Sequence, residues 1–139
     1  MNINEFKKTR GRPRKYATKE ESMTVNKLQI KEWFKTKEGR AYNLADNYKR
    51  MDKKHHRGES TITPKWIEEN IFTSKCYWCG EDDWKQLGCD RIDNNKPHTP
   101  DNVICSCGRC NLKRNIHSFD YFTKFMRSLS RAGKQLTLF

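Results

Sequence analysis

Two cysteine pairs, Cys76-Tyr-Trp-Cys79 and Cys107-Gly-Arg-Cys110, decide how this 139-residue chain folds. Each Cys-x2-Cys pair predicts a turn that points two sulfurs to one side, and two such turns supply the four thiolates of a tetrahedral zinc site. Two disulfides or free core cysteines are the alternatives, and the expected reducing compartment favours zinc. Because four cysteines leave no open coordination position, we expect this zinc to be structural. Cys89 and Cys105 fall outside the pairing and are predicted to be buried small apolar residues.

The composition explains why a metal is needed. Hydrophobic residues make up 34% of the chain and charged residues 33%, with a mean hydropathy of −1.10. Such a chain buries little apolar area, and a metal site compensates by adding folding free energy. No apolar run reaches the roughly 20 residues of a membrane span, and the N-terminus lacks the apolar stretch of a signal peptide. We therefore expect an intracellular, cytoplasmic protein with no membrane partner.

The charge of the chain indicates a polyanionic partner. The net charge is +12 with a pI near 9.6, and most of the excess lies in residues 1–60. A basic front half joined to a nearly neutral, cysteine-bearing back half favours nucleic acid, with DNA as the expected partner.

The sequence pattern predicts an α+β chain in four segments. These are a disordered basic tail over 1–17, a helical DNA-binding region over 18–60, a metal-stabilised domain over 61–131 and a C-terminal tail over 132–139. Helices are expected over 18–34, 38–56, from Pro64 with Thr63 as its cap, from Arg109 and over 118–129, and strands over 88–93 and 103–105.

The helix over 38–56 is expected to be amphipathic. Its predicted buried face comprises Ala41, Leu44, Tyr48 and Met51. Its predicted DNA-facing cations are Lys49, Arg50, Lys53 and Lys54. We expect the apolar face to pack on the domain and the basic face to meet phosphates.

The residues around the second cysteine pair carry a resemblance to a known family. The pattern comprises Asp90-Arg-Ile-Asp93, Pro100-Asp-Asn-Val103 and Cys110-Asn-Leu-Lys113. It resembles the HNH endonucleases, and most of all the zinc-stabilised members of phages and other mobile elements, over roughly residues 62–125. The resemblance implies a ββα-metal unit that hydrolyses phosphodiester bonds with Mg²⁺ or Mn²⁺. A phage-encoded protein of this kind would act in a bacterial host cell.

Carried over by position, the resemblance assigns roles to three residues. Asp90 matches the metal ligand of the first strand, Asn111 matches the second ligand, and Asn102 matches the asparagine that braces the hairpin loop. One carboxylate and one amide oxygen suit a hard ion that keeps water and phosphate in its other positions. Asn115, one helical turn after Asn111, is a possible further ligand. The alternatives are a turn-stabilising carboxylate for Asp90 and a helix cap for Asn111.

The chain departs from the family at Arg91, where most members have the histidine that activates water. An arginine does not lose its proton, so Arg91 is expected to hold the phosphate or to stabilise the transition state. The general base is then open between His98, the nearby imidazole of the hairpin loop, and Asp93. The alternative for His98 is a loop residue that packs or forms hydrogen bonds.

Further cations are expected to contact DNA. Arg10-Gly-Arg-Pro-Arg-Lys15 contains the Gly-Arg-Pro core of an AT-hook, in which Arg10, Arg12, Arg14 and Lys15 would follow a narrow A·T minor groove. A flexible cationic tail without shape preference is the alternative. Lys113 and Arg114, just after the last cysteine, are expected to contact phosphates.

The sequence therefore predicts a metal-dependent HNH-type DNA endonuclease, either a monomer or a homodimer. A zinc-knuckle DNA-binding protein without catalysis is the main alternative, with Arg91 as its chief argument. A zinc-ribbon RNA-binding module is a third, but the chain lacks a recognisable aromatic platform for RNA bases.

Overall fold

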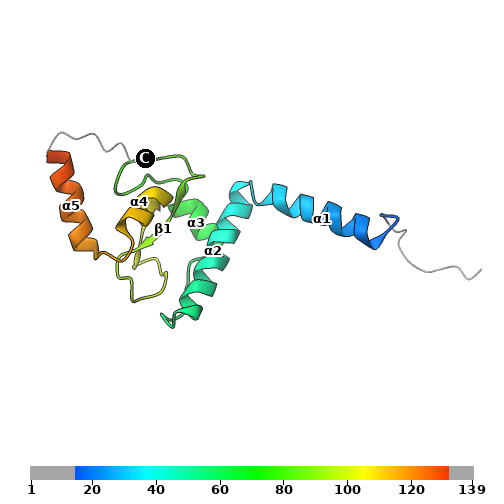
Figure 1. Ribbon diagram of the computed structural model, residues 1–139, viewed down its shortest axis with the longest axis horizontal. Helices are drawn as coiled ribbons and strands as arrows, with labels where there is room; N and C mark the ends of the chain where they lie inside the picture. Colours follow the sequence, from blue (N-terminus) through cyan, green and yellow to red (C-terminus); the bar gives the residue numbers. More distant parts are fainter. Residues whose placement is uncertain (1–14, 132–139) are drawn as a thin grey trace, which may run out of the picture. The chain divides into compact units, whose positions relative to one another are not determined.

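A computed structural model describes residues 15–131 as a small α+β protein with five helices and one two-stranded sheet (Figure 1). The elements are α1 (Lys19–Trp33), α2 (Lys37–Lys54), α3 (Pro64–Asn70), β1 (Leu87–Arg91), β2 (Val103–Cys107), α4 (Gly108–Arg114) and α5 (Phe119–Arg131). The expectations for residues 1–14, including Arg10, Arg12 and Arg14, and for 132–139 lie outside the described residues. No helix within the described range has the length and apolar character of a membrane span.

Helix α1 belongs to a unit of its own, because the chain divides into two compact units after Glu32. Its start agrees with the predicted capping box. The Thr18 hydroxyl accepts a hydrogen bond from the Glu21 N–H at 3.0 Å, and the Glu21 carboxylate accepts one from the Ala17 N–H. No residue of α1 is buried, so capping and helical propensity stabilise this helix more than packing does.

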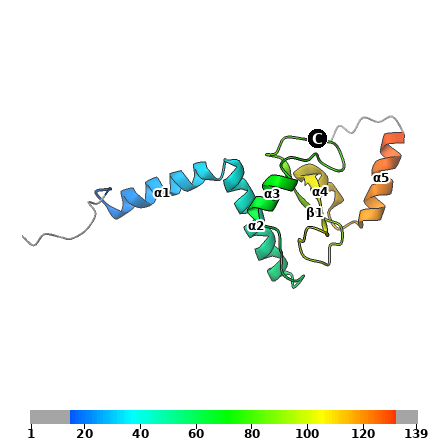
Figure 2. The same cartoon turned by 180° about the vertical axis from the view of Figure 1, so that it is seen from behind.

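The second unit contains all the other elements, beginning with two capped helices that lie side by side (Figure 2). Thr36 caps α2 through the Gly39 N–H, and Thr63 caps α3 through the Trp66 N–H, directly before Pro64. The residues of α2 that are buried at helical spacing are Ala41, Ala45, Tyr48 and Asp52. Met51, which was expected to be buried, is 37% exposed, so the true face is shifted by one residue from the predicted one.

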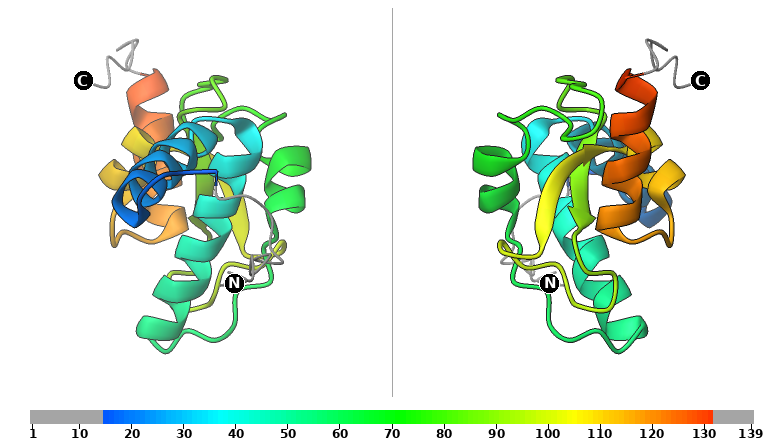
Figure 3. Two further views of the ribbon diagram at one scale, coloured as in Figure 1. Left: turned by 90° about the vertical axis from the view of Figure 1, so that its right-hand side faces the viewer. Right: turned by 90° about the vertical axis from the view of Figure 1, so that its left-hand side faces the viewer.

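The sheet is an antiparallel hairpin whose two strands run side by side in Figure 3. Leu87 pairs with Cys107 and Arg91 with Val103, so each strand contributes five residues. The loop 92–102 joins them, and α4 begins directly after β2. Because α4 begins directly after β2, its first residue, Gly108, lies next to the Leu87–Cys107 pair at one end of the ladder.

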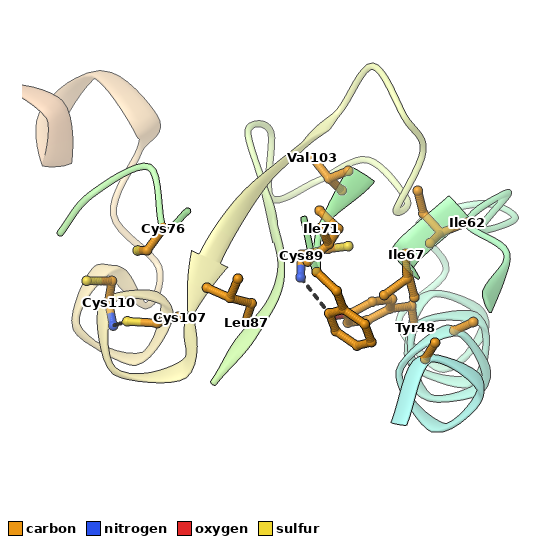
Figure 4. Packing of buried hydrophobic residues seen from close by; sticks show 13 residues of the cluster. Tyr48, Ile62, Ile67, Ile71, Cys76, Leu87, Cys89, Val103, Cys107 and Cys110 are labelled. Carbon is orange, nitrogen blue, oxygen red and sulfur yellow. Dashed lines mark hydrogen bonds between the residues drawn. The ribbon is translucent and has the colours of Figure 1, made fainter. Parts of the chain in front are cut away.

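One core joins α2 to the hairpin (Figure 4). Ile67 and Leu87 are fully buried, and the Tyr48 hydroxyl of α2 accepts a hydrogen bond from the Cys89 N–H at 2.8 Å. A Cβ at position 88 would lie 3.0 Å from that hydroxyl, so Gly88 permits the close approach. Residues on both sides of position 60 therefore share one core, because α2 and the hairpin bury the same apolar surface.

Helix α5 packs on an aromatic cluster at the first cysteine pair. Phe122 and Met126 are buried, and the Trp78 ring contacts Phe119 and Phe122 with centroids 5.2 and 4.8 Å apart. The apolar positions of α5 therefore serve packing, as their spacing predicted.

Candidate active site

The four paired cysteines converge on one point. The Sγ atoms of Cys76, Cys79, Cys107 and Cys110 all lie within 4.8 Å of one another, and those of Cys79 and Cys107 are 3.8 Å apart. Tetrahedral zinc with Zn–S bonds of about 2.3 Å requires sulfurs about 3.8 Å apart. The cluster can therefore hold a metal such as zinc.

The backbone conformation around the cysteines orients their sulfurs toward one another. Gly80 has a left-handed φ of 79° and donates its N–H to the Cys76 carbonyl, which closes the first knuckle. Cys107 ends β2 and is also the N-cap of α4, where its sulfur accepts the Cys110 N–H at 3.5 Å. Hydrogen bonding, chiefly from Cys110, lowers the pKa of the Cys76 thiol to about 4, which favours the thiolate that a metal binds.

The other two cysteines are unlike these four. Cys89 and Cys105 face each other across the hairpin, with Cys89 buried and Cys105 half-buried. Burial raises the pKa of Cys89 to about 12 and that of Cys105 to about 11, so both remain neutral thiols. They lie outside the metal cluster, as their position in the sequence predicted.

Asp90 and Arg114 form a buried ion pair. Arg114 is 1% exposed, and its guanidinium donates to Asp90 Oδ1, to the Arg91 carbonyl and, at 3.1 Å, to the Ile92 carbonyl. The other Asp90 oxygen accepts the Trp78 indole N–H at 3.2 Å. Burial raises the pKa of Asp90, and the Arg114 charge opposes that rise. Arg114 is therefore enclosed in the protein and is not the DNA-facing cation that the sequence predicted.

This pairing bears on the divalent ion that the family resemblance implies. Both carboxylate oxygens of Asp90 already hold donors, and a guanidinium occupies the place of a balancing cation. Asn111 is exposed on α4, and Asn115 follows the helix with a left-handed φ of 47°. The donor types suit Mg²⁺ or Mn²⁺, but in this arrangement Asp90 does not fit the role of a ligand.

Asn102 ties the hairpin loop together. Its Oδ1 accepts the Asp93 N–H at 2.9 Å, and its Nδ2 donates to the carbonyls of Asp93 and Pro97 at 3.1 and 2.9 Å. Asp93 itself accepts the Asn95 N–H at 2.9 Å. These bonds fix the loop that carries His98, which is the bracing role expected of Asn102.

Asp52 of α2, which the sequence analysis did not single out, organises this region. It is fully buried, and its Oδ2 lies 2.7 Å from the His98 backbone N and 2.8 Å from His98 Nδ1. Its Oδ1 lies 3.5 Å from Arg91 Nη1 and 3.9 Å from Arg57 Nη1. Asp52 follows Ala41, Ala45 and Tyr48 at helical spacing, so an acid on the apolar face of a basic helix was the signal available in the sequence.

His98 is held in a defined orientation. Its ring stacks on Tyr48 with centroids 4.2 Å apart and an interplanar angle of 14°. Burial lowers the pKa of His98, against the hydrogen bond and charge of Asp52, so the ring is neutral near neutral pH. Since Nδ1 faces a carboxylate, Nδ1 carries the proton and Nε2 the lone pair. A general base needs a lone pair in this position.

A surface groove of about 720 Å³ lies beside these groups. It is lined by His55, His56, Arg57, Arg91, Asn94, Asn95, Asn115 and Ile116. The remaining predicted DNA contacts are all exposed, comprising Lys15, Lys49, Arg50, Lys53, Lys54 and Lys113. Arg50 also pairs with Asp46 at 3.0 Å.

Comparison with known proteins finds a structural neighbour. No family profile matches the chain, and no curated protein matches its sequence. Among solved structures, the chain is similar to the rare-cutting HNH restriction endonuclease PacI, a protein described as perturbing DNA. The match has a TM-score of 0.50 and 21% identity, and it covers 66% of this chain and 78% of that one. This likeness shows a shared fold.

Proposed function

We propose that this protein is a DNA endonuclease of the HNH type. The observation that carries the proposal is that Arg91, at the family's catalytic position, ends β1 at the groove and shares the Asp52 carboxylate with His98. The likeness in fold to PacI, an HNH restriction endonuclease, supports the proposal. The four-cysteine cluster is proposed to hold structural zinc.

In this proposal a phosphodiester lies in the groove against Arg91, and the groups behind Arg91 assist it. Arg91 donates to the non-bridging oxygens and stabilises the charge that grows in the transition state. His98 Nε2 accepts a proton from the attacking water, while Asp52 stabilises the imidazolium that forms. Asn102 keeps the loop in place. The exposed cations of α2, together with Lys15, Lys113 and the arginines of the arm, neutralise flanking phosphates.

Cleavage of supercoiled plasmid by zinc-loaded protein tests the proposal, with Mg²⁺, with Mn²⁺ and with neither ion. We expect nicked or linear product from the wild type. Arg91→Ala should slow cleavage on the order of 10²–10³-fold, as the loss of one oxyanion donor does. His98→Gln should slow it as well, and Arg91→His, which restores the family's usual base, should keep some activity.

The role of the divalent ion is tested at Asn111, because Asn111→Ala changes an exposed side chain and leaves the buried Asp90–Arg114 pair intact. Unchanged cleavage in Asn111→Ala, with or without added ion, rules out this residue as a ligand.

A DNA-binding protein without catalysis remains the second candidate, because Asp90 is paired with Arg114. Wild-type protein that binds duplex DNA but cuts neither duplex nor single-stranded DNA under any of these conditions would establish it.

A further inference from the structure

Two arginines from distant parts of the chain converge on one oxygen atom. Arg57 follows α2, and Arg91 ends β1. Their Nη1 atoms lie 3.9 and 3.5 Å from Asp52 Oδ1, which accepts no hydrogen bond from the described residues. Arg91 also donates to the Lys96 carbonyl at 3.5 Å. Each guanidinium has five N–H donors, so these contacts leave most of them available.

Both arginines line the groove, and their side chains are 23% and 15% exposed. Within residues 15–131 no acidic residue lines it, whereas three asparagines and two histidines do. One buried carboxylate faces two guanidinium groups, which leaves the groove an excess of positive charge. Burial and the Arg57 charge lower the pKa of Arg91, against the charges of Asp52 and Asp90, and an anion bound in the groove would favour its charged form.

The backbone supports a functional role for the same groove. Among the described residues, His56 and Asn115 are the two non-glycine residues with positive φ, at 52° and 47°, and both line it. Such conformations are uncommon for residues other than glycine, and they cluster at functional sites.

We propose that Arg57 and Arg91 form a clamp for one phosphodiester group of the DNA backbone, with Asp52 as the residue that positions both. The phosphate role of Arg91 is already part of the proposed function. Arg57 is the new element, because it lies outside residues 62–125, which carry the family resemblance. The assignment of DNA as ligand rests on the proposed function. The clamp concerns DNA binding, so measurements of DNA affinity test it without a cleavage assay.

Fluorescence anisotropy with a short labelled DNA duplex tests the clamp, using zinc-loaded protein without added Mg²⁺ or Mn²⁺ over a series of NaCl concentrations. Arg57→Ala should weaken binding about tenfold or more, because it removes charge-assisted hydrogen bonds. It should also reduce the slope of log K against log salt by about 0.9, as expected for one lost phosphate contact. Arg57→Lys should restore the slope but only part of the affinity, since lysine lacks the planar fork.

Lys65→Ala is the matched control, because Lys65 is exposed, pairs only weakly with Glu69 at 3.7 Å and does not line the groove. It should change neither the affinity nor the slope. The clamp is refuted if Arg57→Ala keeps the wild-type slope and an affinity within twofold of the wild type.

The positioning role of Asp52 is tested by a double-mutant cycle in the same assay. In an Asp52→Asn background, where Arg57 is no longer held, Arg57→Ala should weaken binding by clearly less than tenfold. An equal loss in both backgrounds would show that Asp52 does not position Arg57. Zinc content confirms that the variants are folded, and Arg57→Ala and Arg57→Lys decide the clamp whatever the stability of Asp52→Asn.

The cleavage assay separates the two proposals. A wild-type protein that cuts no DNA, yet loses affinity and slope on Arg57→Ala, would retain the clamp and refute the nuclease. If the wild type cleaves DNA but Arg57→Ala keeps the wild-type affinity and salt slope, the nuclease proposal is retained and the clamp is refuted.

Discussion

Replacing Arg114 by methionine should destabilise the protein severely, because it isolates a buried carboxylate. The guanidinium is 1% exposed and contacts Asp90, two backbone carbonyls and the Asn94 side chain. Methionine fills a similar volume, so the loss is mainly electrostatic. Removing one partner of a buried pair costs about 3–5 kcal/mol. For a domain of this size, we expect a fall in Tm of more than about 10 °C.

The loss of stability in Arg114→Met should also depend on pH. Burial already raises the folded-state pKa of Asp90, and without Arg114 that pKa rises further. A carboxyl group whose pKa is higher in the folded than in the unfolded state gives its full stability below the unfolded pKa. That contribution is lost as the pH rises through the folded pKa. The gap between wild type and Arg114→Met should therefore widen from acid to neutral pH.

Urea unfolding of zinc-loaded protein, followed by tryptophan fluorescence, measures both effects. Lys113→Met, which alters the exposed neighbour, is the control and should stay within about 0.5 kcal/mol of wild type. The double variant Asp90→Asn/Arg114→Met should be more stable than the sum of the two single losses implies. A loss for Arg114→Met no larger than that for Lys113→Met would refute the buried-pair reasoning.

Three further predictions concern other parts of the chain. Cys76→Ser should abolish stoichiometric zinc binding, whereas Cys89→Ser should retain one zinc per chain, as measured by metal analysis; unchanged zinc in Cys76→Ser would exclude the four-cysteine site. Deleting residues 7–15 should weaken binding to A·T-rich duplexes more than to G·C-rich ones, and equal losses would indicate a plain cationic tail. Because burial lowers the folded-state pKa of His98, its contribution to stability is present above the unfolded value of about 6.5 and is lost as the pH falls below it. The urea midpoint of wild type should therefore fall on mild acidification more than that of His98→Gln, and parallel curves would contradict this assignment.

Local signals in the sequence predicted much of the fold. Thr63-Pro64 predicted the start of α3, Thr18 and Glu21 predicted the start of α1, and the two cysteine pairs predicted the sulfur cluster. In each case the interacting groups lie within one turn or carry a chemistry that restricts their partners.

The sequence did not indicate the partners that Asp52 and Arg114 have in the fold. The position of Asp52 on the apolar face of a basic helix indicates burial, but its partner His98 is 46 residues away and no local pattern identifies that partner. Arg114 follows Lys113 in a basic run and reads as a surface cation, although it shares a helix face with the buried Cys110. Burial of a charge depends on a partner that only the tertiary fold supplies, and local patterns do not reveal such a partner.

The position of Cys107 gives the metal cluster a second consequence. Cys107 is a sulfur donor, the last residue of β2 and the cap of α4, and it pairs with Leu87 at the end of a ladder of five pairs. A slip of one residue in the pairing of this hairpin would turn the side chains of one strand to the opposite face of the sheet. Such a slip would swing the Cys107 sulfur away from the other three. A metal that requires all four sulfurs would therefore stabilise the observed register of the hairpin over registers that are shifted by one residue, because only the observed register brings the four sulfurs together.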